Sequence, residues 1–352
     1  MSKERLRIGL VGCGRISPRH LQVIQAIPEL ELAAVCDLVE AKARKAVAGT
    51  TARAYVDFQE MLGREELDVV SVLTESGAHA RVGVEIAPRV KALILEKPMA
   101  LTLEDADRLI EACDASRTRL FVVKQNRYNR PVVRLRQALE AGRFGKLVMG
   151  TVRVRWCRGQ DYYDQDAWRG TWKDDGGVLT NQASHHVDLL QWMMGPVESV
   201  KAYTATRLAR IETEDTGVAI LRFTSGALGV IEATTATRPR DLEGSLSLLG
   251  ERGSVVIGGF AVNKLETWSF AQPVPEDEKA FEASVQVPNV YGLGHYEYYL
   301  DVLEAIRGGR RSMLDGLEGR KSLELINAIY ESAATGAEVR LHYKARGVRL
   351  GH

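Results

Sequence analysis

The sequence predicts two domains of different class: a doubly wound α/β domain, followed by an α+β domain with a large, mostly antiparallel sheet. The chain has 352 residues, and a domain commonly takes about 150. Over residues 1–125, near-continuous Val/Ile/Leu runs alternate with helical patterns, as in parallel sheets covered on both faces. Over residues 126–352, apolar and polar residues alternate between short Gly-containing turns. This second pattern is typical of an antiparallel sheet with one face covered.

The elements of the first domain follow from these runs. The apolar runs predict strands at 5–12, 31–37, 67–74, 91–97 and 119–125. Helical patterns at 18–27 and 39–48 follow the first two strands, and further helical stretches separate the others. A strand–helix alternation of this kind gives right-handed crossovers and a parallel sheet.

The second domain opens with a helix at 130–142, which Gly142 and Gly145 bring to an end. Six strands are expected, at 147–156, 199–208, 216–223, 227–237, 244–250 and 253–259. Helices are expected at 177–194, 295–307 and 316–335, and the Pro- and acid-rich stretch 271–294 is expected to be an extended loop.

Composition excludes several classes of protein. With 45% hydrophobic and 26% charged residues, the chain can bury a core and is not disordered. Its 47 Lys and Arg balance 46 Asp and Glu, so we expect neither nucleic acid nor a membrane as a partner. Four cysteines without a C-x-x-C spacing favour a reducing, cytoplasmic compartment and give no metal site. No apolar run approaches the roughly 18 residues of a membrane span, and no signal peptide is evident.

A dinucleotide signature follows the first predicted strand. Residues 12–17 have the form G-x-G-x-x-S, with Arg15 and Ile16 in its variable positions. Gly12 permits the tight turn, and Gly14 lets backbone N–H groups approach a pyrophosphate at a helix N-terminus. Asp37, at the end of the second strand, is placed for ribose hydroxyls and favours NAD over NADP, whose phosphate it would repel. The alternative for Asp37 is an ordinary turn residue.

Two further groups of residues suggest acid–base chemistry. Glu96-Lys97-Pro98 stands at the carboxyl end of the predicted strand 91–97, where open α/β sheets bind ligands, and partial burial would lower the pKa of Lys97. Asn181, His185 and Asp188 occupy positions i, i+4 and i+7 of the predicted helix 177–194, so they share a face. Asp188 could then orient His185 as a general base. A solvated surface lysine and an interior histidine are the alternatives.

The signature, Glu96-Lys97-Pro98 and the pattern G-G-x-L-x-N-x-x-x-H-x-x-D at 176–188 together resemble the Gfo/Idh/MocA oxidoreductase family over essentially the whole chain. The resemblance implies a Rossmann domain that binds NAD, and it places Lys97 and His185 on either side of a sugar hydroxyl. Many relatives have Asp where this chain has Asn181, which implies that Asn181 binds substrate and takes no proton. Thr74 and His79 match a cofactor-binding loop, in which T-E-S-G-A-H replaces the usual T-P-N-x-x-H, and Glu96 belongs to the same cofactor set.

A segment dense in Arg and aromatic residues, 154–172, precedes the predicted helix. Arg suits bidentate contacts with phosphate or carboxylate, and aromatic rings stack on bases and sugars. We expect Arg158, Tyr163 and Arg169 to contact substrate, although a solvated aromatic loop is the alternative.

With residues 181–186 and 232–239, this segment resembles the bacterial branch that oxidises UDP-N-acetylglucosaminuronate (UDP-N-acetyl-2-amino-2-deoxyglucuronate) at C3. These enzymes make precursors of diacetamido-uronic acids for surface polysaccharides.

That resemblance implies hydride transfer from C3 to NAD while His185, or Lys97, takes the hydroxyl proton. It also implies a cofactor that some relatives retain and reoxidise with 2-oxoglutarate, and a homo-oligomer, dimer or tetramer, formed through the sheet of the second domain. Alternatives are another nucleotide sugar, inositol or a free aldose as substrate, or a non-enzymatic NAD(H) sensor or transcriptional regulator. The regulator would need a DNA-binding element, and no such element is evident in the sequence.

Overall fold

The computed structural model describes residues 5–287, 289–310 and 312–341, so the end of the second predicted domain, 342–352, lies outside it. Its first sheet is wholly parallel, in the order β3-β2-β1-β4-β5-β6. The strands are β1 (Leu6–Val11), β2 (Leu30–Cys36), β3 (Arg53–Tyr55), β4 (Val69–Val72), β5 (Ala92–Leu95) and β6 (Arg119–Val122). This order confirms the doubly wound Rossmann prediction. The sequence did not predict β3, because two of its three residues are exposed and no apolar run marks it.

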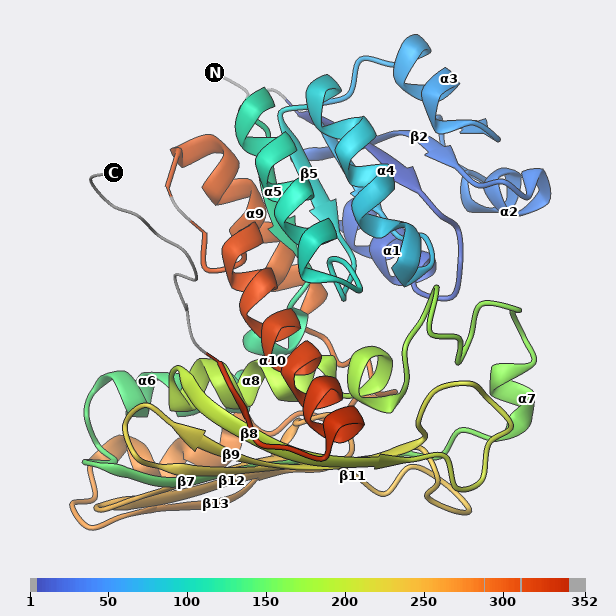
Figure 1. The fold of residues 1–352 in the computed structure, drawn as a ribbon. Helices are drawn as coiled ribbons and strands as arrows, with labels where there is room; N and C mark the ends of the chain where they lie inside the picture. Colours follow the sequence, from blue (N-terminus) through green and yellow to red (C-terminus); the bar gives the residue numbers. More distant parts are fainter. Residues whose placement is uncertain (1–4, 288, 311, 342–352) are drawn as a thin grey trace, which may run out of the picture.

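Helices cover both faces of this sheet (Figure 1). They are α1 (Ser17–Ala26), α2 (Glu40–Ala46), α3 (Phe58–Arg64), α4 (His79–Ile86) and α5 (Leu103–Ser116). Helix α5 starts where Thr102 caps it, since the Thr102 hydroxyl accepts from the Asp105 N–H. Apolar side chains of α4 and α5 pack on one face of the sheet, and those of α1 pack on the other.

The second sheet has the order β13-β12-β11-β7-β10-β9-β8-β14. Its strands are β7 (Leu147–Arg155), β8 (Val197–Ala205), β9 (Thr216–Phe223), β10 (Leu228–Thr234), β11 (Glu243–Gly250), β12 (Gly253–Gly258), β13 (Lys264–Phe270) and β14 (Val339–Arg340). The pair β7–β10 is parallel and the other pairs are antiparallel. The mostly antiparallel prediction is therefore confirmed, with β13 and β14 as strands that the sequence did not reveal.

Helices lie on one face of this second sheet, between it and the Rossmann layer (Figure 1). They are α6 (Arg130–Glu140), α8 (Ser184–Met194) and α10 (Gly316–Thr335), and their apolar residues share a core with the strands. The other face carries no helix in Figure 1. The short helix α7 (Gln160–Tyr163) belongs to the loops at one end of the sheet. The described residues of 271–294 are irregular apart from a 3₁₀ segment, Pro275–Ala283.

The C-terminal part of the chain returns to the first domain. Helix α9 (His295–Gly308) buries Tyr298 and Tyr299 completely in the same cluster as Ile8 and Leu10 of β1. Helix α9 and strand β1 thus contribute to the same core, although nearly 300 residues of sequence separate them.

The predicted single helix over 177–194 is interrupted. Residues Val178–Gln182 form one π-helical turn, Ala183 follows it, and α8 begins only at Ser184. Asn181 and His185 therefore do not belong to one regular helix face, and the i, i+4, i+7 spacing does not describe the site. Single π turns are common at functional sites.

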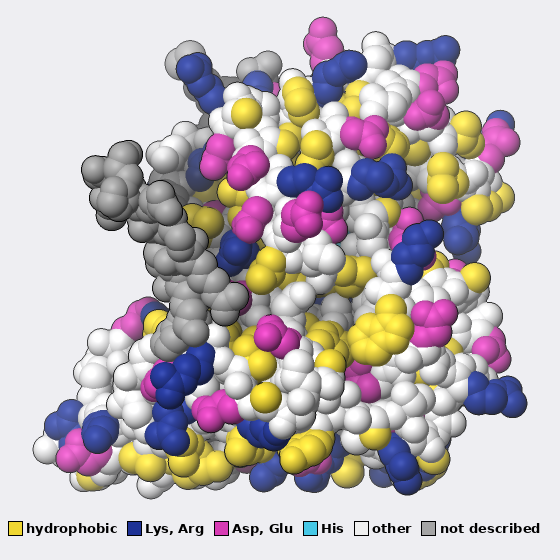
Figure 2. All heavy atoms as spheres, viewed as in Figure 1, with side chains coloured by type: hydrophobic (Ala, Val, Ile, Leu, Met, Phe, Trp, Pro, Cys, Tyr) yellow, Lys and Arg dark blue, Asp and Glu magenta, His cyan; other side chains and the backbone are white. Residues whose placement is uncertain are grey.

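The surface agrees with the balanced composition. In Figure 2, Lys and Arg side chains are interspersed with Asp and Glu over the described part of the face shown, without a large area of one sign. Among the described residues, no helix combines the length and the apolar character that a bilayer span needs.

Candidate active site

The loop between β1 and α1 has the shape that a dinucleotide requires. Gly12 has φ +99°, and a Cβ there would lie 2.6 Å from the carbonyl of Leu73. Around Gly14, by contrast, no described atom lies within 4 Å of a built Cβ, so its backbone is open to a ligand. At the start of α1, the N–H groups of Ser17 and Arg19 donate to the carbonyls of Gly14 and Ile16, and Pro18 has no N–H, so the N–H groups available to a ligand are those of the loop itself. These residues fit a bound pyrophosphate.

Asp37 lies beside this loop, as the signature predicts. Its carboxylate accepts hydrogen bonds from the backbone N–H of Cys13 at 2.7 Å and of Val39 at 2.8 Å. The side chain thus ties the turn after β2 to the glycine loop. Ile16 is half-buried at the start of α1, and the exposed Arg15 places its guanidinium 5.5 Å from the ring centre of Tyr162.

Thr74 lies in the loop after β4, and His79 is the first residue of α4. The ring of His79 is buried and links two backbone carbonyls, with Nδ1 2.7 Å from the Pro98 oxygen and Nε2 2.9 Å from the Thr74 oxygen. Burial lowers the pKa of His79, against the opposing effect of these carbonyls. The structure therefore places His79 as a support that holds the Thr74 loop against the segment carrying Lys97.

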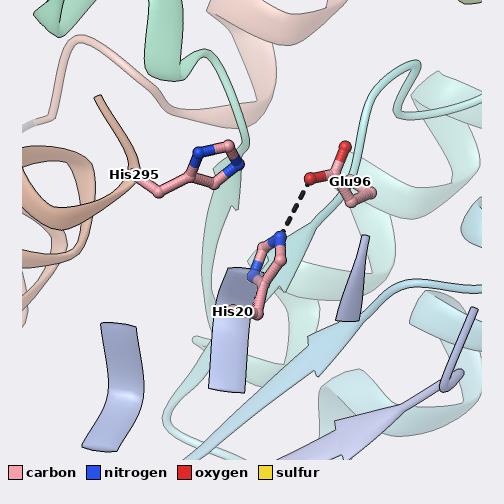
Figure 3. A group of neighbouring side chains, drawn as sticks. All are labelled: His20, Glu96 and His295. Atoms are coloured by element: carbon pink, nitrogen blue, oxygen red, sulfur yellow. Dashed lines mark hydrogen bonds and ion pairs between the residues drawn. The ribbon is translucent and has the colours of Figure 1, made fainter. Parts of the chain in front are cut away.

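The buried His20 anchors Glu96, and His295 lies near the two residues (Figure 3). His20 of α1 contacts Glu96 with Nε2 at 3.0 Å, and its Nδ1 lies 2.7 Å from the Tyr299 hydroxyl. The other Glu96 oxygen accepts from the Lys97 N–H at 3.0 Å. Burial alone would raise the pKa of Glu96, but the His20 bond and the nearby charges of His20 and Lys97 hold it below its usual range. A fixed anion therefore supports the backbone of Lys97.

The same group also has a donor set that metal ions use. His20, Glu96 and His295 each offer one atom, all within 4.8 Å of one another. However, both nitrogens of His20 and both oxygens of Glu96 already have protein partners. Of the three residues, only His295 has two ring nitrogens without a hydrogen-bond partner among the described residues, and burial lowers its pKa to about 3. We therefore interpret the group as a hydrogen-bonded anchor.

Lys97 reaches from the Rossmann domain to the second domain. Its Nζ donates to the backbone carbonyl of Asn181 at 2.7 Å. Burial lowers the pKa of Lys97, while the charges of Glu96 and Asp175 oppose that effect. The π turn thus presents a carbonyl that fixes the lysine where the two domains meet.

Asn181 has a carboxylate partner that the sequence did not suggest. Its amide Nδ2 donates to Asp175, whose second oxygen accepts from the Gly170 N–H at 2.7 Å. Asp175 is buried, and burial raises its pKa against these hydrogen bonds and the charge of Lys97. Asn181 therefore contacts both groups: its side-chain amide binds the buried Asp175 carboxylate, and its backbone carbonyl binds Lys97.

His185 lies close to Lys97, as predicted, but its expected partner does not. The ring Nε2 lies 2.9 Å from the amide nitrogen of Gln125. Burial, followed by the charge of Lys97, lowers the pKa of His185 well below its usual value. The expectation that Asp188 orients His185 is wrong, because the Asp188 carboxylate is engaged by Arg127, with two bonds of 2.8 Å, and by Lys124.

Next to this pair is a small cavity of about 20 Å³. Its lining includes Lys97 and His185 together with Lys124, Asp188 and Ser184. Lys124 also donates to the Ser322 hydroxyl at 2.9 Å, and burial lowers its pKa to about 8. Burial alone would raise the pKa of Asp188, but Arg127 and Lys124 hold it below its usual range. The negative charge of Asp188 is thus balanced by Lys124 and Arg127, and the carboxylate makes no hydrogen bond with His185.

The arginine-rich segment converges on Tyr162. The guanidinium of Arg169 lies 4.6 Å from the Tyr162 ring centre and that of Arg158 lies 5.6 Å from it, so with Arg15 three arginines surround one ring. The Tyr162 hydroxyl accepts from Arg169 at 2.8 Å and from Gln182 at 2.9 Å. Arg158 is also bound to Asp241 at 2.8 Å, and Arg169 to Asp166 at 3.0 Å.

Tyr163, the tyrosine chosen from the sequence, lies beneath this group. Its ring is buried, and its hydroxyl lies 2.9 Å from that of Thr235. Tyr162 could not be told from Tyr163 in the sequence, because adjacent tyrosines differ only in the direction of the side chain. Gln125 was also not expected at the site, since its partner His185 comes from a segment far away in the chain. Asp175 was not expected either, because its partner Asn181 lies in the π turn that the sequence did not predict. Tyr291 was missed as well, and its pKa is raised by burial, with Arg15, Tyr162 and Arg158 among the groups acting on it.

Known proteins share this architecture. Residues 6–124 match the family model described as "Oxidoreductase family, NAD-binding Rossmann fold", and residues 136–341 match "Oxidoreductase family, C-terminal alpha/beta domain", the two halves of Gfo/Idh/MocA. Among curated proteins, the chain is 28% identical to myo-inositol 2-dehydrogenase of Thermotoga maritima, over 96% of this chain and 98% of the relative.

Two solved structures are more similar in sequence. The WlbA dehydrogenase of Bordetella pertussis, in complex with NADH and UDP-GlcNAcA, is 46% identical with a TM-score of 0.94, covering 98% of this chain and 100% of that one. The WlbA dehydrogenase of Chromobacterium violaceum, in complex with the same two molecules, is 43% identical with a TM-score of 0.92, covering 98% of both chains. The chain belongs to the Gfo/Idh/MocA family of NAD-dependent oxidoreductases.

Proposed function

We propose that the enzyme oxidises the 3-hydroxyl of UDP-N-acetyl-2-amino-2-deoxyglucuronate to a ketone, with NAD as the cofactor. The observation that carries this proposal is the convergence of Lys97 and His185 at the junction of the two domains, where Lys97 contacts the π turn that precedes the histidine. The likeness to two dehydrogenases solved with NADH and UDP-GlcNAcA supports the choice of substrate.

The residues divide the chemistry between them. NAD, when bound, supplies the hydride acceptor. His185, whose pKa is well below its usual value, is neutral at pH 7 and accepts the hydroxyl proton. Lys97 is held at 2.7 Å by the Asn181 carbonyl and carries the positive charge that stabilises the developing alkoxide. The anchor of His20 and Glu96 keeps the lysine backbone in place.

The arginine cluster is the proposed site of the anionic part of the substrate. A UDP-uronate carries two phosphates and a carboxylate, and guanidinium groups bind both in bidentate fashion. Arg15, Arg158 and Arg169 surround Tyr162, which offers a ring face for stacking. Asn181 contributes polar contacts at the sugar end, and the buried Tyr163 packs edge-on against Tyr162 with ring centres 5.1 Å apart.

The proposal includes the enzyme's setting. The product would serve the biosynthesis of diacetamido-uronic acids for bacterial surface polysaccharides, a cytoplasmic process. The cofactor would remain bound and be reoxidised by 2-oxoglutarate.

The enzyme would also work as a homo-oligomer, a dimer or a tetramer. The supporting observation is the bare face of the second sheet, where large apolar side chains are exposed on adjacent strands: Val148, Tyr203, Val218, Ile220, Leu228 and Leu249.

A substrate panel tests the function. The purified enzyme is mixed with NAD and UDP-GlcNAcA, and the absorbance of reduced nicotinamide is followed with and without added 2-oxoglutarate. UDP-GlcNAc removes only the carboxylate, UDP-glucuronate removes only the acetamido group, and myo-inositol represents the other curated activity. We expect reduction with UDP-GlcNAcA, and at least tenfold lower kcat/KM with each of the others. A higher kcat/KM for inositol or for UDP-GlcNAc would refute the proposal.

A further inference from the structure

The hydrogen bond on the ring of His185 is made by a neutral amide. Gln125 lies in the short turn that follows β6, is 2% exposed, and places its amide nitrogen 2.9 Å from His185 Nε2. Among the described residues, this is the one hydrogen bond that the His185 side chain makes. An amide nitrogen only donates, so in this geometry the ring accepts and is neutral.

The oxygen and the nitrogen of the Gln125 amide can exchange positions. The buried Oε1 of Gln125 has no hydrogen-bond partner among the described residues, so no other contact fixes the direction of the amide. Rotating the amide by half a turn places Oε1 against Nε2, where it accepts from an Nε2–H. Gln125 can therefore contact the ring both when Nε2 is bare and when it carries a proton.

The two carboxylates near the ring of His185 are both engaged by other side chains. The groups that act on His185 are Lys97 and Glu96 at the end of β5 and Asp188 and His186 on α8. Three more charged groups lie in the same network: Lys124 and Arg127 bind Asp188, and Glu318 binds Arg127. Asp188, the carboxylate nearest in the helix, is committed to Lys124 and Arg127, and Glu96 is committed to His20. The partner that touches His185 therefore carries no charge.

We infer that Gln125 is a positioning residue for His185, holding the imidazole while leaving it unprotonated before reaction. The inference rests on the proposed function, in which His185 accepts the substrate proton. In the form that accepts the proton, the amide is turned so that Gln125 Oε1 accepts from Nε2–H, which leaves Nδ1 without a proton. The hydroxyl proton then goes to Nδ1, and the ring becomes an imidazolium whose Nε2–H still donates to Oε1. The alcohol thus loses one hydride and one proton, and Gln125 neither gains nor loses an atom.

Two substitutions separate positioning from charge. Gln125→Glu keeps the shape and adds a carboxylate on Nε2–H, which should raise the pKa of His185 by about 1–3 units. The acidic limb of the kcat/KM profile with NAD and UDP-GlcNAcA should then move to higher pH by the same amount.

Gln125→Met removes the hydrogen bond and should lower kcat by about 10- to 100-fold with KM within about threefold. Gln137→Glu, an exposed site on α6, is the matched charge control and should leave the profile unchanged.

A second readout does not depend on the substrate. The titration of His185 in protein with isotope-labelled histidine is followed by NMR, and the His185→Ala variant identifies its signal. A raised midpoint in Gln125→Glu supports the inference, and an unchanged midpoint overturns it. Should that variant not fold, an unchanged kcat in Gln125→Met overturns it. Full activity of His185→Ala would instead refute the proposed role of the histidine, while the NMR titration would still decide whether Gln125 holds the ring.

Discussion

Two glycines of the nucleotide loop differ in what surrounds them. At Gly12 a Cβ would meet backbone atoms of Leu73 at 2.6 Å, and φ is +99°. At Gly14 a Cβ would meet nothing within 4 Å among the described residues. The first glycine is therefore required by the fold itself, whereas the second leaves room for a ligand.

This contrast predicts different results for two alanine variants. Gly12→Ala should lower the melting temperature, because a positive φ and a backbone clash both oppose the side chain. Gly14→Ala should leave the melting temperature of the NAD-free protein within experimental error and weaken NAD binding at least tenfold. Thermal unfolding and a fluorescence titration with NADH measure both effects. Equal NADH affinity in Gly14→Ala and the wild type would show that the cofactor does not approach this backbone.

The sequence identified residues by type and place, and it was less able to assign their partners. Lys97 and His185 could be singled out because each follows a recognisable motif, and the structure brings them together. The pairing of Asp188 with His185 was wrong, since spacing along a helix gives no information on the cations that β6 and its following turn bring from elsewhere. Tyr162 and Tyr163 are adjacent, and only the packed structure distinguishes the one facing the arginines from the one facing Thr235.

At the scale of the element, the π turn before α8 depends on a buried carboxylate. Oε1 of Glu214 accepts from the Leu179 N–H at 3.0 Å and from the Tyr330 hydroxyl at 2.9 Å. The Thr180 hydroxyl lies 2.8 Å from the same Tyr330 hydroxyl. These partners come from distant parts of the chain, so local propensity could not predict that the helix expected over 177–194 would break here.

Glu214 makes the stability of the protein dependent on pH. Burial, against its hydrogen bonds, raises its pKa from 4.5 to about 7, so the folded state holds the proton more tightly than the unfolded state. The resulting stabilisation is complete below pH 4.5 and is lost as pH rises through 7. Glu214→Gln keeps the shape without the charge. It should exceed the wild type in unfolding free energy by up to about 3 kcal/mol at pH 8, with a much smaller difference at pH 4.5.

Urea unfolding at several pH values between 4.5 and 8 checks this expectation. Glu282→Gln, at an exposed position, serves as the control and should follow the wild-type curve. Parallel curves for Glu214→Gln and the wild type would mean that Glu214 remains ionised in the folded protein throughout the range.

At the scale of the whole molecule, the bare sheet face predicts association. Ile220, on β9, is 59% exposed. Arg153 and Arg155 of β7 form ion pairs with Glu232 of β10 and Glu243 of β11. Ile220→Glu adds charge to the apolar part of this face without touching the core. We expect light scattering to give a smaller assembly than the wild type, with an unchanged circular dichroism spectrum.

Val56→Glu, which changes an exposed residue of the Rossmann domain, should keep the wild-type mass. A wild-type enzyme that is itself monomeric would contradict the assignment of this face as an interface.

The sequence was most informative about architecture at this scale. Runs of Val, Ile and Leu distinguish a doubly covered sheet from a half-covered one, because burial on one or both faces sets the periodicity directly. It could not show that α9 packs into the first domain, since the apolar face of a helix does not identify the sheet that it covers.

The position of α9 bears on how the protein is made. Tyr298 and Tyr299 share a core with Ile8 and Leu10, so the first domain lacks part of its interior until synthesis has passed residue 299. During that interval the face of its sheet that α9 will cover is exposed to the cell, where unprotected apolar surface invites aggregation and chaperone binding. The cofactor site, whose Glu96 anchor uses Tyr299 through His20, is completed only after that point.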